Sequence, residues 1–446
     1  NDLGPHHSSF PDTLETERYK LIAAQEMAKH KVVAAYLLGR CFPGSDLMAL
    51  AERLKSIAPD IRAEYDTDLA ECARGDEKLA YMMAVDAAFV VEFLRCNASE
   101  ESKPGQEILV DVDSGATTDR SRSRSRSKSK LREAMYKGYF CSRFPRPLRK
   151  SILQDLVLLE NQLPMKVLWE VVRLDQRCRN GDGEAEEVLG LLVKDFAAEA
   201  LPFPGLSPRV LEDAALKEVK QRKHLLDCLY AIVTSTLKGS HAYNGESPDH
   251  DSRVEQKPTH FPSASELYNC GIHLKASRET EEAGNMSSIW YDSASTTLYI
   301  PRVRVGDDTE RLFRNLIAYE SHLIDKVSVV SYFRFMNGLV DTAEDVALLV
   351  QRGILAQDIG SNHDVAQMWN NLCINTMRVC SESHEHIAKK LSAHCKSRTN
   401  AWKAEFKRTY LSRPWLLISV ISAAALLIMT FVITYYTVLI YVSGEG

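Results

Sequence analysis

The longest apolar run of the chain lies near its C-terminus. Residues Trp415–Tyr441 (WLLISVISAAALLIMTFVITYYTVLIY) contain no charged side chain over 27 positions. At a rise of ~1.5 Å per residue, a helix of this length reaches ~40 Å, which exceeds a bilayer hydrocarbon core of ~30 Å. A buried helix of a soluble core would carry a polar stripe, and the five hydroxyl side chains of this run are too few and too weakly polar to form one. The run therefore predicts a single, somewhat tilted transmembrane helix.

Elsewhere the apolar positions recur mostly with the period of a helix. This spacing predicts helical segments at residues 17–40, 46–73, 77–95, 131–179 and 208–234. The third segment is apolar on nearly all sides, so we expect it at the centre of a helical core.

Between these helices and the C-terminal run, the pattern changes. Residues 272–274, 288–291 and 297–305 read as short strands, the last two joined by a turn over residues 292–295. Helix starts of capping-box form follow, and Gly353 closes the second of these helices; the boxes are Asp307-x-x-Glu310, Thr342-x-x-Asp345 and Ser361-x-x-Asp364. The predicted fold class is mainly α: a multi-helix globular body with one small antiparallel β element and a single C-terminal transmembrane helix.

The charges beside the apolar run predict its direction. Six basic residues precede it, against one acid between Lys403 and Arg413; they are Lys396, Arg398, Lys403, Lys407, Arg408 and Arg413. The five residues after it carry Glu445 as their sole charge. The excess of positive charge predicts that the large N-terminal part lies in the cytosol. Aromatic residues at the two ends of the run suit the membrane interfaces: Trp415 at one, and Tyr435, Tyr436 and Tyr441 at the other.

Composition narrows the class of protein. The net charge of −5 argues against a general nucleic-acid binder. The ten cysteines are scattered without a CxxC pair, which favours reduced thiols in a cytosolic body over a disulfide framework. Residues 1–30 lack the apolar core of a signal peptide, and the chain begins at Asn1, so we expect it to be truncated or processed. The sequons at Asn97 and Asn285 have meaning only if the body lies outside the cytosol.

An alternating Arg/Ser tract interrupts the helical pattern at residues 120–130. Its like charges cannot bury apolar surface, so we interpret it as part of a solvated, disordered linker; RNA contact, a phosphorylation switch and anionic lipid are the alternatives.

The predicted organisation is then an N-terminal helical part (1–96), the linker (97–135), a main helical body with a small sheet near residues 272–305 (136–395), a basic juxtamembrane helix (396–414), the transmembrane helix (415–441) and a short tail (442–446).

The sequence contains few candidate motifs for metal binding or catalysis. No phosphate-binding glycine loop, GxSxG elbow, HExxH or EF-hand pattern occurs. The candidate metal ligands are Cys373, Cys380, His384, His386, His394 and Cys395. Zinc ligands normally stand at tighter spacing, so we interpret this set as one face of a buried helix, with His384 and His386 as surface histidines. No metal and no cofactor are expected.

The segment Asp155–Pro164 (DLVLLENQLP) reads as a corner between two helices. Pro164 cannot continue the preceding helix but suits the start of the next. We expect Asn161 to cap the helix formed by residues 165–172 and Gln162 to bond backbone groups freed at the corner. Asp155 and Glu160 could alternatively act as an acid–base pair, although no neighbouring His or Lys is evident in the sequence.

Seven motifs, in order, resemble the plant DUF 247 (UPF 0481) family of uncharacterised membrane-anchored proteins. The likeness covers residues 4–441. Gly4–His7 resembles the end of "GPYHH", Tyr81–Leu94 resembles "MMxxDGCFxxEFL", and Asp155–Pro164 is similar to "DLLLLENQIP". The remaining motifs are "AxELxxAGVxFK" (264–276), "LxIPxLxIDDxTExLFRNLIAYE" (298–320), "FMxxLIxTxEDVxLLxxxGII" (335–355) and "WKAxLxxxYFxxPW" (402–415).

The family that the sequence resembles has no established enzymatic activity, so no catalytic residues carry over; Asp155, Glu160, Asn161, Gln162 and Pro164 are its signature positions. Some grass members are implicated in self-incompatibility, which would make them recognition proteins. We therefore expect a membrane-tethered, non-enzymatic protein-interaction or signalling protein, whose partners are the lipid bilayer and another protein. The alternative is a membrane-bound enzyme with an unrecognised site. A nucleic-acid partner is disfavoured.

Overall fold

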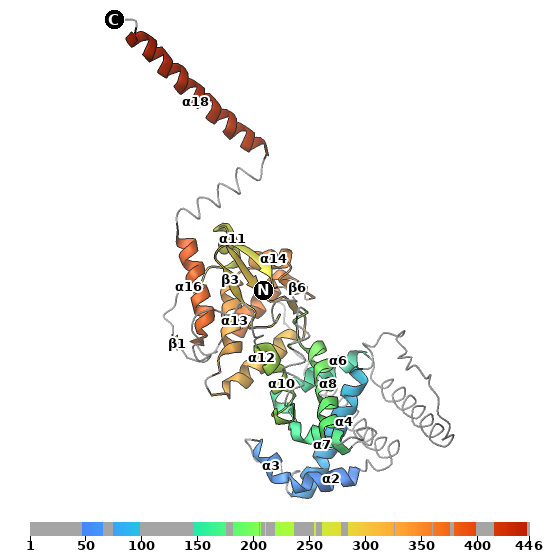
Figure 1. The fold of residues 1–446 in the computed structure, drawn as a ribbon. Helices are drawn as coiled ribbons and strands as arrows, with labels where there is room; N and C mark the ends of the chain where they lie inside the picture. The colour runs from blue at the N-terminus through green and yellow to red at the C-terminus, as the bar shows by residue number, and fades with distance from the viewer. Residues whose placement is uncertain are drawn as a thin grey trace, which may run out of the picture. The chain divides into compact units, whose positions relative to one another are not determined.

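A computed structural model gives the structure of the protein (Figure 1). It describes residues 47–65, 75–98, 146–174, 182–204, 206, 210, 219–235, 254–255, 261–277, 284–324, 326–358, 360–374, 379–397 and 414–443. The helix expected at 17–40, the Arg/Ser tract and the juxtamembrane segment with Lys403, Lys407, Arg408 and Arg413 lie outside these residues. The mainly helical fold is confirmed.

The described body forms two compact units, and the first takes in the residues up to 238 with 279–285 and 308–323. Its elements are α2 (Leu47–Ser56), α3 (Ala58–Ala63), α4 (Asp76–Ala98), α6 (Arg146–Leu156), the 3₁₀ turn η2 (Leu159–Asn161), α7 (Met165–Leu174), α8 (Asp182–Ala200), the 3₁₀ turn η3 (Val219–Gln221), α10 (Leu225–Thr234) and α12 (Thr309–Ser321).

Helix α4 is the centre of the first unit, as its apolar sequence predicts. It packs against α2, α7 and α8 (Figure 1). Leu79, Ala84, Val91 and Phe93 are almost completely buried along it. Glu92 is buried as well and is compensated by an ion pair with Arg95 at 2.5 Å. A carboxylate can occupy this core because its charge is paired there.

Helix α8 was not predicted from the sequence. It contains Gly183 and Gly190, and glycine lowers helix propensity by about 1 kcal/mol relative to alanine. Burial of Leu189, Val193 and Phe196 supplies the packing that the local propensity lacks.

The second unit comprises residues 239–278, 286–307 and 324 onward. Its helices are α11 (Ala264–Asn269), α13 (Ser328–Leu339), α14 (Ala343–Gln351), α15 (Asn362–Leu372) and α16 (Glu382–Lys396). Its strands are β1 (Val254–Glu255), β2 (His273–Ala276), β3 (Trp290–Asp292), β4 (Thr297–Ile300), β5 (Val303–Val305), β6 (Leu355–Gln357) and β7 (Val379–Cys380). The aromatic rings of Tyr332, Phe333 and Trp369 pack together in its core.

The predicted β element is a hairpin within a mixed sheet. Strands β3 and β4 pair antiparallel, as expected, while β2 pairs with β4 in parallel. The strand expected at 297–305 breaks into β4 and β5 at Pro301, which has no N–H to donate to a ladder. Strand β5 then pairs in parallel with β6, and β1 pairs antiparallel with β7. The described β structure is therefore three small sheets rather than one antiparallel element.

Two of the predicted helix starts are confirmed and one is displaced. The capping box of Thr342 and Asp345 starts α14, and the Ser361 side chain accepts the N–H of Asp364 at the start of α15. Gly353 ends α14 with a φ of +69°, as predicted. The box at Asp307 is wrong: the N-cap of α12 is Asp308, whose side chain makes no capping hydrogen bond because it contacts Lys150 and Gln154.

The C-terminal apolar run forms α18 (Pro414–Ser443), a helix of 30 residues. The window Ile421–Leu439 is long and apolar enough to cross a membrane, and none of it is buried by the rest of the protein. Thr430, Thr434 and Thr437 donate their hydroxyls to carbonyls four residues back. These polar groups are therefore satisfied within the helix itself.

Candidate functional site

The signature segment Asp155–Pro164 forms the corner between α6 and α7, in the first unit. Its central residue is Gln162, whose side-chain nitrogen donates to the carbonyls of Leu156 at 2.8 Å and Leu158 at 2.7 Å. Its side-chain oxygen accepts the N–H of Leu226 at 3.0 Å, in the first turn of α10. The expectation that Gln162 bonds freed backbone groups is confirmed, and one of those groups belongs to another helix.

Two further hydrogen bonds fix the same corner. The N–H of Leu159 donates to the Asn315 side chain of α12 at 2.8 Å. The N–H of Met165, at the start of α7, donates to the carbonyl of Lys223 at 2.7 Å. The first N–H groups of a helix have no partner inside it, so these contacts satisfy groups that would otherwise be lost to burial. The corner is thus linked by hydrogen bonds to α6, α7, α10 and α12.

The other signature residues have smaller roles. Pro164 is buried directly before α7, as the corner requires. Asn161 ends η2 and is exposed, four residues before Met165, so its predicted capping role is wrong because Pro164 occupies the preceding position. Glu160 is exposed in η2. Partial desolvation raises the pKa of the largely exposed Asp155, and the charge of Arg311 opposes the shift.

A polar network between α10 and α12 adjoins the corner and was not expected from the sequence. The Tyr319 hydroxyl donates to Asp227 at 2.9 Å, and the Tyr230 hydroxyl donates to Glu320 at 2.9 Å. The N–H of Asp227 donates to the His224 ring, which caps α10. Burial lowers the pKa of His224 to about 4 and raises the pKa of Tyr319 far above its ordinary value. His224 is therefore neutral at physiological pH and acts as a hydrogen-bond acceptor.

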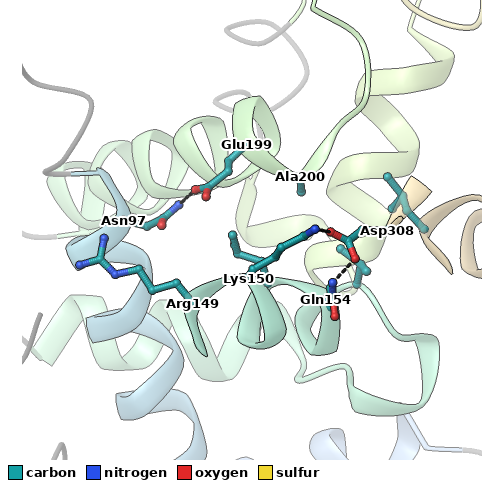
Figure 2. Close-up of a pocket in the computed structure, with 10 residues that line it drawn as sticks. Asn97, Arg149, Lys150, Gln154, Glu199, Ala200 and Asp308 are labelled. Atoms are coloured by element: carbon teal, nitrogen blue, oxygen red, sulfur yellow. Dashed lines mark hydrogen bonds and ion pairs between the residues drawn. The ribbon is translucent and has the colours of Figure 1, made fainter. Parts of the chain in front are cut away.

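A cleft of about 530 Å³ opens along α6 in the same unit (Figure 2). We call it the α6 cleft. Its lining residues are Asn97, Arg149, Lys150, Leu153, Gln154, Val157, Glu199, Ala200, Asp308 and Leu312. Its apolar surface includes Leu153, Val157 and Leu312, and the other lining residues are mostly amides and charged side chains of both signs.

An ion pair and two hydrogen bonds join side chains that line the α6 cleft. Lys150 lies 2.8 Å from Asp308, which also accepts a hydrogen bond from Gln154, and Asn97 donates to Glu199 (Figure 2). Lys150 is 55% exposed and Asp308 36%, so water or a ligand can reach this ion pair. Exposed pairs of this kind contribute about 1 kcal/mol or less and can be exchanged at low cost. The arrangement is suited to binding a polar ligand that carries both charges.

The residues proposed as metal ligands do not form a site among the described positions. No group of three or more His, Cys, Asp or Glu side chains is arranged there to hold a metal ion. Cys373 ends α15, Cys380 lies in β7 and His384 lies in α16, so the expected single helical face is wrong. His384 is not a surface residue either: it is 7% exposed and forms a 2.7 Å hydrogen bond with Ser331.

The cysteines are not uniform. Cys228, Cys270, Cys373 and Cys395 form no disulfide, whereas Cys96 is disulfide-bonded. The expectation of reduced thiols therefore fails at Cys96, since scattered spacing alone cannot show which cysteines the fold brings together.

The aromatic residues predicted to anchor the chain in a membrane lie on α18. Tyr435 and Tyr436 are 57% and 60% exposed near its C-terminal end, and Trp415 and Tyr441 lie within the same helix. A helix of this length with tyrosines near one end has the form of a membrane span with an interfacial aromatic belt.

These features define a class: a mainly helical body, with a corner of fixed hydrogen bonding and a mixed-charge cleft, followed by an apolar C-terminal helix. The sequence matches the family described as "Plant protein of unknown function" (DUF247) over residues 2–429, so the chain belongs to that family. It is 22% identical to the "Putative UPF0481 protein At3g02645" of Arabidopsis thaliana, over 96% of this chain and 84% of that protein. It is also 22% identical to "UPF0481 protein At3g47200" of Arabidopsis thaliana, over 67% of this chain and 62% of that protein. No solved structure matches the chain significantly.

Proposed function

We propose that this chain is a membrane-tethered, non-enzymatic recognition or signalling protein that binds a partner protein in the α6 cleft. The observation that supports it best is the pairing of an accessible mixed-charge cleft in the body with an exposed apolar helix after it. The helix supplies the tether and the cleft supplies the contact surface.

The proposed membrane tether is supported by the length of α18 and by the hydrogen bonds that its hydroxyl groups make within the helix. A helix of 30 residues extends ~45 Å, enough to cross a hydrocarbon core of ~30 Å with some tilt. None of the window Ile421–Leu439 is buried by the rest of the protein, and large apolar residues such as Leu427 and Phe431 would stand 72% and 73% exposed in water. Exposure of that much apolar surface is favourable in lipid and costly in water.

The charges that precede the proposed span favour a cytosolic body. Basic residues are concentrated between Lys396 and Arg413, and the positively charged flank of a span is preferentially retained in the cytosol. The Cys96 disulfide favours the opposite side, because disulfides persist mainly in oxidising compartments. We give the flanking charges more weight, since they act directly on the direction of insertion.

A reporter experiment tests this placement. A glycosylation sequon fused after Gly446 should be modified, while Asn97 and Asn285 stay unmodified, if the body is cytosolic. Glycosylation of Asn97, at the half-buried end of α4, would show the reverse orientation.

The α6 cleft fits a polypeptide better than a polyanion. Arg149 and Lys150 offer cations, but Glu199 and Asp308 line the same cleft and would repel phosphate groups. A peptide segment with one acidic and one basic side chain could exchange with the Lys150–Asp308 pair while its apolar atoms cover Leu153 and Val157.

The enzyme alternative needs Asp155, Glu160 and a histidine in one pocket. The α6 cleft is lined by none of them. The described Ser331–His384 pair has the residue types of a nucleophile and base, but Ser331 is fully buried and His384 nearly so. A substrate could not reach that serine without unfolding the site.

Proximity labelling in plant membranes tests the proposal. The full chain should label a reproducible set of proteins, and Arg149→Glu with Lys150→Glu should lose part of that set. Lys166→Glu is the matched control, since Lys166 is an exposed lysine of the same unit that does not line the cleft. Identical labelled sets for all three proteins would contradict the assignment of the cleft.

A further inference from the structure

Three cationic side chains gather beside helix α7 of the first unit, outside the α6 cleft. Elements α2 and η3 both pack against α7. They bring Arg53 and Lys220 to the same part of the surface as Arg173 of α7, around the buried side chains of Trp169 and Glu170. We call Arg53, Arg173 and Lys220 the α7 cationic cluster. Its members come from three separate parts of the sequence and meet only in the folded chain.

The carboxylate of Glu170 orients the two arginines. Arg53 Nε donates to Glu170 Oε1 at 3.4 Å, and Arg173 donates Nε and Nη2 to Oε2 at 3.0 and 2.8 Å. Both carboxylate oxygens are therefore in use, and no other carboxylate pairs with either arginine among the described residues. Both Nη groups of Arg53 and the Nη1 group of Arg173 remain as unused donors.

The third cation has no carboxylate partner in the described part of the chain. The Lys220 ammonium lies 3.8 Å from the centroid of the Trp169 ring, and the Arg173 guanidinium carbon lies 5.2 Å from it. An indole ring attracts cations but carries no net charge, so it does not neutralise them. Three cations against the one carboxylate of Glu170 leave an excess of two positive charges.

The side chains of the cluster offer donors and no unused acceptor. Guanidinium and ammonium groups donate only, and so does the indole N–H of Trp169, which is buried and has no acceptor among the described residues. One cation would suffice to neutralise Glu170, so the role of an ion pair within the core does not account for the other two. A complementary ligand would be rich in acceptors and carry about two negative charges.

We infer that Arg53, Arg173 and Lys220 form a binding site for a phosphate monoester group. Such a group carries about −1.5 to −2 charges at pH 7 and three acceptor oxygens, which matches both the charge excess and the unused donors. Guanidinium groups bind phosphate through parallel hydrogen bonds, and an ammonium adds a point charge. The side chains of Arg53 and Arg173 are 49% and 25% exposed and that of Glu170 is 6% exposed, so a ligand reaches the cations while the carboxylate stays covered.

The neighbouring charges leave this balance unchanged. Lys166 lies one turn before Glu170 on α7, and its ammonium is 3.9 Å from a carboxylate oxygen of Glu64. That pair is neutral as a whole. A phosphate diester carries only one negative charge, so it would leave one cation of the cluster unmatched and should bind more weakly than a monoester.

Calorimetric titration of the full chain, held in phosphatidylcholine nanodiscs, with glycerol 3-phosphate tests the site. The parent protein should bind, and its affinity should fall as sodium chloride is raised. Arg53→Gln and Lys220→Gln should each raise the Kd about tenfold, because each removes one charged donor. Arg53→Gln leaves Arg173 on Glu170, so the buried carboxylate keeps a partner. Lys55→Gln is the matched control, since this lysine of α2 pairs with Glu77 at 2.6 Å, and it should leave the Kd unchanged.

A second arm distinguishes a soluble ligand from a lipid headgroup, since both can present a phosphate monoester. The nanodiscs are mixed with phosphatidylcholine vesicles that contain phosphatidic acid, a monoester, or phosphatidylglycerol, a diester. Co-sedimentation with the phosphatidic acid vesicles alone, reversed by glycerol 3-phosphate, would assign the site to a headgroup. Binding of glycerol 3-phosphate without co-sedimentation would assign it to a soluble monoester.

A footprint on the parent protein keeps the test independent of how any variant folds. Acetylation of exposed lysines, read by mass spectrometry, should slow at Lys220 when glycerol 3-phosphate is present and stay unchanged at Lys55. Three results would overturn the inference: no binding of either monoester, equally tight binding of the diester dimethyl phosphate, or binding that leaves the acetylation of Lys220 unchanged.

Discussion

The side-chain oxygen of Gln162 accepts the backbone N–H of Leu226 at 3.0 Å, so the corner before α7 also caps the first turn of α10. The same side chain donates to two carbonyls at the end of α6. One glutamine thus satisfies three backbone groups from two separate parts of the chain. The signature segment is best explained by this structural role.

Gln162→Leu should therefore destabilise the first unit. The substitution leaves two carbonyls and one N–H without their partner, and we expect a loss of about 1–3 kcal/mol in the free energy of unfolding. Gln162→Glu retains an acceptor for Leu226 but sets a carboxylate oxygen against the carbonyls of Leu156 and Leu158, so its loss should be at least as large. Chemical denaturation followed by circular dichroism measures both.

The control for this prediction is Gln221→Leu, at an exposed glutamine of η3. It should change the stability by less than about 0.5 kcal/mol. Equal effects at the two glutamines would show that the hydrogen bonds of Gln162 carry no special weight.

The corner also shows what sequence reasoning reaches and where it stops. Pro164 and Gln162 act within a few residues of themselves, so the joint and the bonding of Gln162 could be predicted. The partner Leu226 lies 64 positions away, and no local pattern identifies it. The α6 cleft could not be predicted for the same reason, since Asn97, Lys150, Glu199 and Asp308 meet only in the folded chain.

The second unit shows the same contrast between local contacts, which the sequence predicts, and long-range contacts, which it does not. The capping pair of Thr342 and Asp345 was predicted because its residues are three apart. The other donors to Asp345 were not: the Ser263 hydroxyl at 2.9 Å and the Ser265 N–H at 2.8 Å come from the start of α11. Asp345 is thus a link between α11 and α14 as well as a cap.

Asp345→Asn should lower the stability of the second unit and change its pH dependence. Burial opposes ionisation of Asp345, but hydrogen bonds from Ser265, Thr342 and Ser263 outweigh it and lower the pKa. A lowered pKa stabilises the folded state above the unfolded value of about 3.9, and this stabilisation is lost as the pH falls below it. The variant should lack this contribution and lose about 1–3 kcal/mol at pH 7.

Urea unfolding at several pH values between 3 and 7 measures the Asp345 effect. Asp341→Asn, at an exposed neighbour, should follow the parent protein throughout. If Asp345→Asn and the parent lose stability in parallel below pH 4, the lowered pKa has no consequence for folding.

The buried histidines predict a second pH dependence, at higher pH. Burial lowers the pKa of His224 and of His384 to about 4, against about 6.5 when unfolded. Between these values the unfolded chain binds protons that the folded chain does not, so stability should fall as the pH drops from 6.5 toward 4. It should be constant, as far as these two groups are concerned, above about pH 7.

Replacing one histidine measures its own contribution to the pH dependence of stability. His384→Asn can keep a hydrogen bond to Ser331 without titrating, and it should reduce the pH 5–6.5 slope of stability by about one proton. Because half of the unfolded histidine is already deprotonated at pH 6.5, this corresponds to about 1.5 kcal/mol over this range. His363→Gln, at an exposed position of α15, is the control, and an unchanged slope in His384→Asn would contradict the burial of His384 as the cause.

The proposed membrane span, α18, offers the sharpest single substitution. Ile428 is exposed near the middle of α18, so Ile428→Arg would place a charge close to the bilayer centre. Insertion should become less favourable by about 3 kcal/mol or more, depending on how far the side chain reaches the interface. Ile428→Leu keeps the apolar character and should insert like the parent.

Two independent readouts test this prediction for the full chain: carbonate-resistant membrane association and glycosylation of a reporter after Gly446. Both should fall in the arginine variant alone. If the arginine variant and the parent are equally membrane-bound and the reporter is unmodified in both, α18 is not a span, and a peripheral attachment through the body would have to explain the association.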